Sequence, residues 1–304
     1  MNLLDRAVVA ALPAVPKRLV GRLSSRYIAG PGLDDALRVV RGLNAEGKLA
    51  TVDVLGEEVQ REDEAAAIAT AYVDALDAFE REGLDANVSV KPPGVGLKLG
   101  YAVCKPHVER VIEAAEPTDR FVRIDMEDSS TTDDTLRLCR ELRDEGHGRV
   151  GPVLQASLRR TVDDARSLAG ASVRICKGLY VEPESIQYRD DLDVRQSFLR
   201  TLEALLDGGA YAAIATHDEW LVDRALELLR ERGLGADRYE FQMLLGVRPE
   251  LGDRIVAAGH RLRIYVPYGE KWYEYSLRRL QENPKIAGYV AGDLGRSLVR
   301  GRSS

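Results

Sequence analysis

Two adjacent arginines, Arg278 and Arg279, lie in the segment whose residue types say most about the chemistry of this chain. An apolar run ends at Pro267 just before it, which predicts that a strand ends there and a helix follows. Tyr275, Arg279 and Glu282 are spaced i, i+4 and i+7, so they share one helix face. Neighbouring guanidiniums repel unless an anion lies between them, and their forks match a carboxylate. The segment predicts a small-carboxylate site; the alternative is a solvated face with an Arg278–Glu282 pair.

Polar residues also recur at the downstream ends of short apolar runs along the chain. In a parallel barrel such residues meet at one face and point to the active site. Each alone has a plain alternative, because a lysine that closes a strand is usually solvated and Asp125 could cap the next helix. The residues at these run ends are Asp53, Lys91, Asp125, Gln155, Arg174, Lys177, Thr216, His217, Gln242 and Tyr265.

The run Val173–Gly178 carries the strongest of these signals. Arg174 and Cys176 share one strand face, so the sequence predicts that Arg174 points into the barrel. An arginine there needs an anionic or electron-rich partner. Lys177 and Gly178 at the strand tip resemble a phosphate-contacting corner, because glycine permits close approach of the backbone.

Thr216 and His217 add a hydroxyl and an imidazole to the same predicted face. The plainer hypothesis for His217 is a ring satisfied by the backbone. Cations at several strand ends, with few candidate bases, suit a phosphate-bearing cofactor and a small carboxylate, with the cofactor doing the chemistry. No Ser-His-Asp, Cys-His or P-loop pattern occurs in the sequence.

We expect no metal centre. Hard cations need several carboxylates from separate strands, and Asp53 and Asp125 alone offer that, even with Glu127 and Asp128 nearby. The 4 histidines are scattered, and the 3 cysteines form no CxxC pair. Unbridged cysteines indicate a reducing compartment, so we expect a cytoplasmic protein.

Short β-branched runs alternate with longer segments of helical periodicity from residue 48 onward. Helices are predicted over Glu62–Glu82 and Glu219–Arg232, with starts at Thr132 and Thr161. Eight βα units match a (β/α)8 barrel better than a doubly wound sheet, and no GxGxxG motif follows the first strand. The predicted strands are Leu49–Leu55, Asn87–Lys91, Phe121–Met126, Pro152–Ser157, Ser172–Cys176, Ala212–Thr216, Tyr239–Leu244 and Leu262–Val266.

The 304 residues are predicted to form one domain, with helices over residues 1–47, a barrel over 48–290 and a tail over 291–304. A net charge of −6 and the lack of a basic run with aromatics argue against nucleic-acid binding. The N-terminal segment is too interrupted by proline and charge to span a membrane. We expect it to form an amphipathic helix that packs on the domain or makes peripheral contact with the inner membrane.

These residues occur in motifs that resemble the FAD-dependent proline dehydrogenases, and the chain is identified as similar to the monofunctional bacterial type. The resemblance covers about residues 40 to 285, and it implies the family's distorted (β/α)8 TIM-type barrel with a final helix that carries Arg278 and Arg279 over the site. The motifs are Val88–Lys91, Arg123–Ser129, Leu154–Ala156, Val173–Gly178, Ile214–Asp218, Phe241–Arg248 and Tyr265–Leu280.

The resemblance also implies roles for individual residues. Arg278 and Arg279 would bind the carboxylate of L-proline with Lys91 nearby, and Asp125 and Glu282 would hold these cations in place. The residues implied around the substrate ring are Leu244, Tyr265 and Tyr275. The residues implied to hold FAD are Met126, Gln155, Arg174, Cys176, Lys177, Gly178, Thr216 and His217, with Arg174 near flavin N5.

By the same resemblance, hydride transfer to FAD gives 1-pyrroline-5-carboxylate, and a quinone at the membrane takes the electrons. The sequence does not identify the group that accepts the amine proton. Leu179 stands where the family usually has alanine, which leaves the fit of the substrate open. Three alternatives remain: 4-hydroxyproline oxidation, which Tyr265 should disfavour by crowding the hydroxyl; a Schiff-base lyase using Lys91; and a non-catalytic amino-acid-binding barrel.

Overall fold

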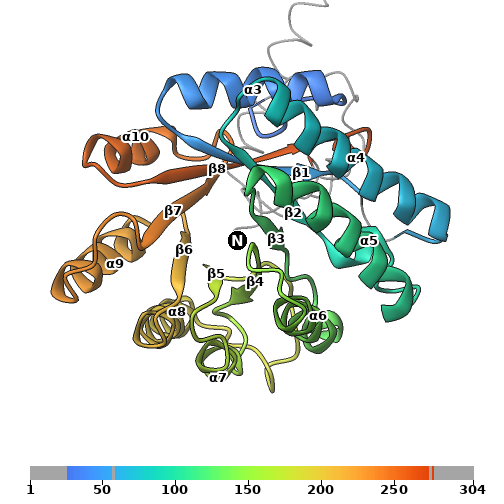
Figure 1. Cartoon of the computed structure of the whole chain (residues 1–304). Helices are drawn as coiled ribbons and strands as arrows, with labels where there is room; N and C mark the ends of the chain where they lie inside the picture. Colours follow the sequence, from blue (N-terminus) through green and yellow to red (C-terminus); the bar gives the residue numbers. More distant parts are fainter. Residues whose placement is uncertain (1–25, 57–58, 274–275, 277–304) are drawn as a thin grey trace, which may run out of the picture.

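Eight parallel strands form a closed barrel in the computed structural model, which describes residues 26–56, 59–273 and 276. Each strand pairs with its neighbours in sequence order, and β8 closes the barrel by pairing in parallel with β1 (Figure 1). The strands are β1 (Leu49–Val54), β2 (Ala86–Val90), β3 (Val122–Ile124), β4 (Val150–Gln155), β5 (Ser172–Cys176), β6 (Tyr211–Ala215), β7 (Tyr239–Leu244) and β8 (Leu262–Tyr268).

The helices surround the barrel and cover its outer surface (Figure 1). The α-helices are α3 (Leu33–Ala45), α4 (Glu62–Arg81), α5 (Tyr101–Ala115), α6 (Thr132–Asp144), α7 (Thr161–Arg166), α8 (Asp191–Asp207), α9 (Glu219–Glu231) and α10 (Pro249–Ala257). Short 3-10 turns are η2 (Pro92–Val95), η3 (Glu116–Thr118) and η4 (Ser129–Thr131). In a regular barrel each covering helix follows its strand. Here α3, which precedes β1, packs against both β1 and β8.

The predicted (β/α)8 barrel is therefore confirmed, and the predicted strands lie within a few residues of the observed ones. The prediction that Pro267 ends the last strand is wrong, because β8 continues to Tyr268. Pro267 lacks an N–H, yet its carbonyl accepts a hydrogen bond from the Ala29 amide at 2.9 Å. The Leu55 amide donates to the Tyr268 carbonyl at 2.7 Å, so the strand stays paired past the proline.

The inner and outer faces of the strands differ in chemistry. Outward residues such as Val52, Ile124 and Phe241 pack with the helices in the apolar core. Barrels of this class usually fill their interior with branched apolar side chains, whereas the alternate, inward positions here are largely polar. The buried polar residues on the strands are Thr51, Asp53, Ser89, Arg123, Gln155, Arg174, Glu240 and Gln242.

Several predictions concern residues outside the described ranges. They are the final helix with Arg278 and Arg279, the tail over 291–304, and most of the N-terminal helices, of which α3 lies within the described part. No helix among the described residues is both long and apolar enough to cross a membrane.

Candidate active site

A cavity of about 1280 Å³ lies among the C-terminal ends of the strands and the loops that follow them. Asp53 does not line it, but every residue within the described ranges that the family resemblance implies for the site does, from β2 round to β8. These residues are Lys91, Asp125, Met126, Gln155, Arg174, Cys176, Lys177, Gly178, Thr216, His217, Leu244 and Tyr265. Tyr275, Arg278, Arg279 and Glu282 lie outside the described residues.

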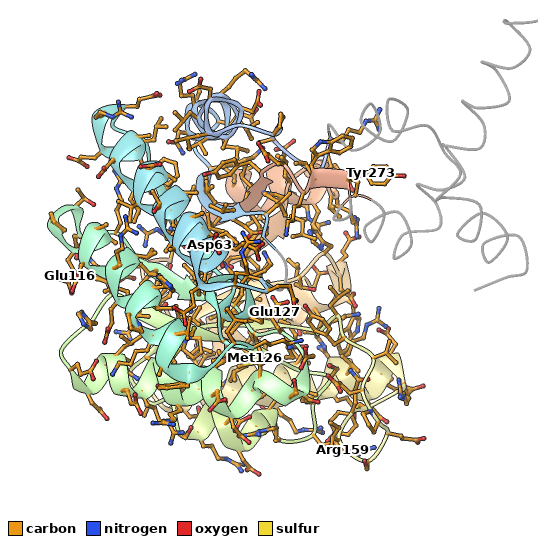
Figure 2. All side chains as sticks on the ribbon, turned by 90° about the vertical axis from the view of Figure 1, so that its right-hand side faces the viewer. Asp63, Glu116, Met126, Glu127, Arg159 and Tyr273 are labelled. Carbon is orange, nitrogen blue, oxygen red and sulfur yellow. The ribbon has the colours of Figure 1, made fainter. Side chains whose placement is uncertain are left out.

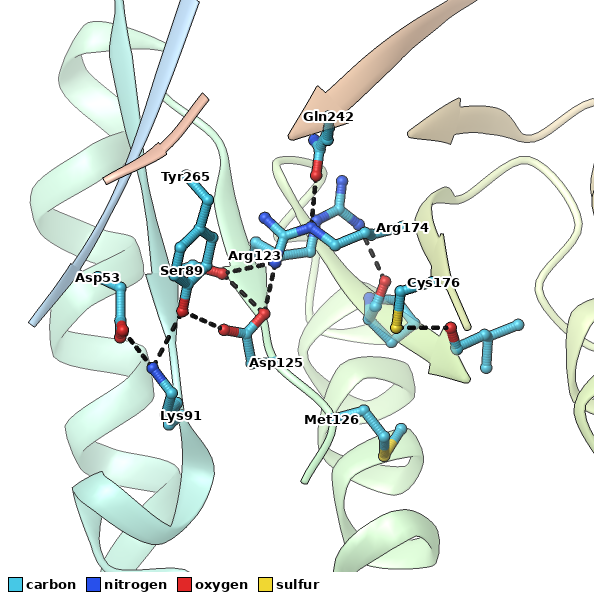
Figure 3. Close-up of polar contacts among 12 residues, drawn as sticks. Asp53, Ser89, Lys91, Arg123, Asp125, Met126, Arg174, Cys176, Gln242 and Tyr265 are labelled. Atoms are coloured by element: carbon cyan, nitrogen blue, oxygen red, sulfur yellow. Dashed lines mark hydrogen bonds and ion pairs between the residues drawn. The ribbon is translucent and has the colours of Figure 1, made fainter. Parts of the chain in front are cut away.

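Arg174 on β5 points into the barrel, where Asp125 is its anionic partner (Figure 3). Its Nη1 atom donates to Asp125 Oδ1 at 2.6 Å and to Ser89 Oγ at 3.0 Å, and its Nε atom donates to Gln242 Oε1 at 2.5 Å. Both side chains of the ion pair are almost fully buried, at 7% and 11% exposure. Burial strengthens the attraction between the two charges. Separating them would leave a buried charge without its partner, so the guanidinium is held in place.

Asp125 accepts hydrogen bonds from three side chains and does not act as a helix cap. Besides Arg174, Ser89 Oγ donates to its Oδ1 at 2.8 Å, and the Tyr265 hydroxyl donates to its Oδ2 at 3.0 Å. The capping role falls to Asp128, whose Oδ1 accepts from the Ser130 amide at 3.0 Å. In the loop after β3, the buried carboxylate of Asp125 and the capping carboxylate of Asp128 therefore have different roles.

Lys91 at the end of β2 forms a buried ion pair with Asp53 of β1 (Figure 3). Its Nζ atom also donates to the Tyr265 hydroxyl at 3.0 Å, which links the pair to Asp125. Burial alone would lower the pKa of Lys91, but the nearby carboxylates of Asp53 and Asp125 raise it above its ordinary value. Lys91 is therefore a fixed cation. A Schiff-base lysine needs a lowered pKa, so the lyase alternative is not favoured.

The predicted phosphate corner at the end of β5 is only partly free for an anion. Lys177 Nζ is paired with Asp218 at 2.7 Å and with Asp191 at 2.9 Å. Although burial alone would raise it, hydrogen bonds from Arg195 and Lys177 lower the pKa of Asp218 to about 2. Gly178 has φ of 103°, and a side chain there would collide with Ser157. This tip therefore accepts glycine alone without strain.

The hypothesis that the backbone satisfies the His217 ring holds for one of its two nitrogens. Its Nε2 atom accepts a hydrogen bond from the Leu244 amide at 2.8 Å. Nearby, Thr216 Oγ1 accepts from the Asp218 amide at 3.1 Å. Burial raises the pKa of Cys176 to about 11, so it is a neutral thiol in the cavity wall. These three side chains contribute to the shape of the cavity more than to its electrostatic potential.

Three residues of the site were not assigned to it from the sequence: Ser89, Tyr180 and Glu127, the last of which was considered only as a candidate cation ligand. Ser89 was recoverable, because it precedes Lys91 by two positions and so shares its strand face. Tyr180 lies in the loop between β5 and α8, where no periodicity indicates direction. Its hydroxyl donates to Glu127 Oε2 across the cavity wall.

The closed parallel barrel with a polar cavity at its C-terminal face defines a (β/α)8-barrel protein with its candidate active site in the usual place. The family profile for proline dehydrogenase matches residues 36–291. Proline dehydrogenase 1 of Bacillus subtilis subsp. natto is 34% identical over 87% of this chain and 88% of its own length. Proline dehydrogenase of Deinococcus radiodurans is 35% identical over 88% of each chain.

The chain belongs to the proline dehydrogenase family and is therefore an oxidoreductase. The bifunctional protein PutA of Escherichia coli is 26% identical over 90% of this chain but only 24% of its own length. The structure of PutA from Bdellovibrio bacteriovorus inactivated by N-propargylglycine shares the fold, with a TM-score of 0.83 and 24% identity over 91% of this chain and 36% of that one.

Proposed function

We propose that this chain oxidises L-proline to 1-pyrroline-5-carboxylate by hydride transfer to FAD, the first step of proline catabolism, and that the electrons then pass to a quinone. The observation that carries this proposal is the fixed, buried Arg174 in a cavity that also contains the cation Lys91. Held in place by their carboxylate partners, Arg174 would face the cofactor and Lys91 the substrate carboxylate.

The cavity residues fit FAD in size and in donor set. At about 1280 Å³ the cavity exceeds the roughly 300–1,000 Å³ of ordinary small-ligand pockets, which leaves room for a large cofactor and a small substrate. Nε and Nη1 of Arg174 donate to protein partners, whereas Nη2 donates no hydrogen bond to the described residues. FAD, when bound, supplies the hydride acceptor.

Arg174, Gln155 and Met126 would hold the ring system of FAD, and Cys176, Lys177, Gly178, Thr216 and His217 would hold the remainder. The side-chain amide of Gln155 is held in place, because its Nε2 atom donates a hydrogen bond to the Glu127 carbonyl at 2.6 Å. The Thr161 hydroxyl at the start of α7 also donates to the Gln155 carbonyl. A preorganised cation such as Arg174 stabilises negative charge that develops nearby, without reorganisation during the reaction.

The substrate would be bound through its carboxylate by Lys91 together with Arg278 and Arg279. Leu244 and Tyr265 line the cavity and would pack against the substrate ring. Tyr275 is proposed to do the same. Asp125 and Glu282 would keep the cations oriented. Fixing the substrate in this way supplies part of the barrier reduction through positioning alone.

A quinone acceptor and peripheral contact with the inner membrane complete the proposal. Their support is the pattern of apolar and basic residues from Leu3 to Leu23. Reduction of a water-soluble ubiquinone analogue by proline, measured with the purified protein, tests the acceptor. Co-sedimentation with anionic vesicles tests the membrane contact separately.

An absorbance spectrum of the purified protein is the first experiment. We expect a yellow protein that releases FAD on denaturation and bleaches when L-proline is added without oxygen. A colourless protein, or a yellow one that L-proline does not bleach, contradicts the proposal. Comparison of kcat/KM for L-proline and 4-hydroxyproline in the same assay decides between the two substrates.

The arginine pair is tested by Arg279→Met. A charge-assisted hydrogen bond contributes about 1.5–3 kcal/mol, so the apparent KM for proline should rise about 10- to 100-fold. The control is Arg230→Met on the exposed face of α9, which should leave KM unchanged. An unchanged KM in Arg279→Met contradicts the carboxylate clamp.

A further inference from the structure

Proline oxidation needs a group that accepts a proton from the substrate nitrogen, and the proposed function leaves that group open. At neutral pH the amine is an ammonium, whose nitrogen has no free electron pair. The proton must leave before the carbon beside the nitrogen can give up a hydride. A general base for this step must lie in the cavity, carry a free lone pair and be unprotonated at working pH.

Glu127 is a cavity carboxylate of which, among the described residues, one oxygen accepts a hydrogen bond and the other does not. The Tyr180 hydroxyl donates to its Oε2 atom, while Oε1 accepts no hydrogen bond from the described residues. The hydrogen bond from Gln155 Nε2 to the Glu127 carbonyl at 2.6 Å fixes its backbone. In the side view, Glu127 lies toward the middle of the molecule, whereas Glu116 and Arg159 lie at its edge (Figure 2).

The other acid–base groups at this end of the barrel are occupied. Asp125 accepts from Arg174, Ser89 and Tyr265, so both of its oxygens are engaged. Asp53 is fully buried in its pair with Lys91. His217 uses Nε2 to accept the Leu244 amide. In contrast to these groups, Glu127 makes no ion pair within 4 Å with the described residues, and its one side-chain hydrogen bond among them comes from Tyr180.

The surroundings of Glu127 poise it as a base. Burial raises its pKa above the ordinary value of 4.5, Lys91 and the Tyr180 hydrogen bond oppose that rise, and Asp125 and Asp53 reinforce it. Lys98 also lines the cavity but is paired with Asp128 at 3.1 Å. A carboxylate with a raised pKa is a stronger proton acceptor than an exposed one.

We propose that Glu127 is the general base that takes the proton from the substrate amine, with Tyr180 positioning its carboxylate; this inference rests on the proposed function. The nitrogen–hydrogen bond breaks and an oxygen–hydrogen bond forms at Glu127. The carbon–hydrogen bond beside the nitrogen then breaks, its electron pair leaves as hydride to the flavin oxidant, and the nitrogen lone pair forms the carbon–nitrogen double bond. The substrate loses one proton and one hydride, which is a two-electron oxidation.

Glu127→Gln tests this step, because glutamine keeps the shape and the Tyr180 contact but accepts no proton. In the wild-type holoenzyme, kcat/KM for proline should fall at acid pH as Glu127 becomes protonated. The variant should lose that acid limb, and the rate constant for anaerobic flavin reduction should drop by about 10²- to 10⁴-fold. Inhibition by cyclopentanecarboxylate, which has no amine, should be unchanged.

Two further variants separate proton transfer from structure. Tyr180→Phe removes a hydrogen bond that holds the pKa of Glu127 down, so its acid limb should move to higher pH. Glu182→Gln is the matched control, because Glu182 joins the same two loops through Ser129 N and Oγ at 2.7 and 2.8 Å but does not line the cavity. It should keep both the rate and the acid limb.

The outcomes distinguish this inference from the proposed function. If proline fails to bleach the wild-type flavin, the proposed function is wrong. If wild type reacts but Glu127→Gln reacts within about threefold of it with the same acid limb, only the role of Glu127 is overturned. That role is equally overturned if Tyr180→Phe leaves the acid limb in place.

Discussion

The barrel interior contains two layers of buried charge that differ in the kind of partner they use. Near the cavity, Arg174 and Lys91 are held by side chains, namely Asp125, Asp53 and the Tyr265 hydroxyl. A second set lies further from the cavity, toward the opposite end of the barrel. It consists of Arg123, Glu240 and Arg263, which we call the lower layer.

Backbone carbonyls satisfy much of the lower layer. Arg123 Nη1 donates to the carbonyls of Pro152 and Ser172 at 3.0 and 2.7 Å. Arg263 Nη1 donates to the Ala50 carbonyl at 2.7 Å, and its Nε donates to Glu240 Oε1 at 2.8 Å. These bonds tie neighbouring strands together, and none of the three lower-layer residues lines the cavity.

A buried charge in a barrel is therefore not in itself evidence of an active site. Charges that bond to carbonyls of adjacent strands serve the fold, whereas charges that bond to other side chains around a cavity can exchange contacts with a ligand. This agrees with the general division of such barrels into a stabilising bottom face and a functional top face. The two layers should therefore respond differently to mutation.

The largest effect is expected from Glu240→Gln in the lower layer. This change leaves Arg263 buried without its carboxylate, and breaking a buried ion pair costs about 3–5 kcal/mol. The free energy of unfolding in urea should fall by that amount, while kcat/KM of the folded protein changes little. Asp163→Asn, at an exposed pair with Arg166, is the control and should cost less than about 0.5 kcal/mol.

The next effect concerns Arg174→Met in the layer of charges near the cavity. Loss of one preorganised charge near the reacting atoms lowers the rate by about 10²- to 10³-fold, and FAD retention should weaken as well. The matched variant is Arg123→Met, which should reduce stability but keep kcat/KM per folded molecule. Equal losses of activity in the two variants would remove the functional distinction between the layers.

A smaller effect is expected from Tyr265→Phe. The lost hydroxyl donates to Asp125 Oδ2 and accepts from Lys91 Nζ, both at 3.0 Å. Hydrogen bonds to charged groups contribute about 1.5–3 kcal/mol, so kcat/KM for proline should fall about 10-fold or more. Tyr211→Phe removes a 3.3 Å hydrogen bond to Glu240 in the lower layer and should leave steady-state kinetics unchanged.

The smallest effect is a pH dependence at the rim of the cavity. The pKa of Asp218 is about 2 in the folded protein, below its ordinary 3.8, so the carboxylate stabilises the fold above pH 4 and this contribution is lost as pH falls toward 2. Its partners Lys177 and Arg195 are about one-third exposed, which limits the gain to about 1 kcal/mol. The stability difference between wild type and Asp218→Asn should shrink between pH 4 and pH 2.

The strand positions were predictable because each strand is a short β-branched run between helical segments. The helices α4 and α9 were likewise predicted to within one residue at each end. Pro267 misled because proline usually ends a strand, but it remains paired through its carbonyl. The direction of Arg174 was also predictable, since alternation along a strand fixes which side chains point inward.

Partners were not predictable from alternation. Ser89, Asp125 and Tyr180 lie on β2, after β3 and after β5, and no local pattern states which of them meet. Tyr180 in particular lies on a loop without periodicity, so its contact with Glu127 depends on how two loops pack. A role for Glu127 followed only when its neighbours were known.

Local periodicity and ordered motifs were sufficient to predict the eight strands, the inward direction of their polar residues and the family. Which charges meet depends on the three-dimensional fold, because closure of β8 onto β1 brings Tyr265 to Lys91 across 174 positions of the chain. Strand register sets the height of each side chain in the barrel, and only that height separates the charges that stabilise the fold from those that line the cavity.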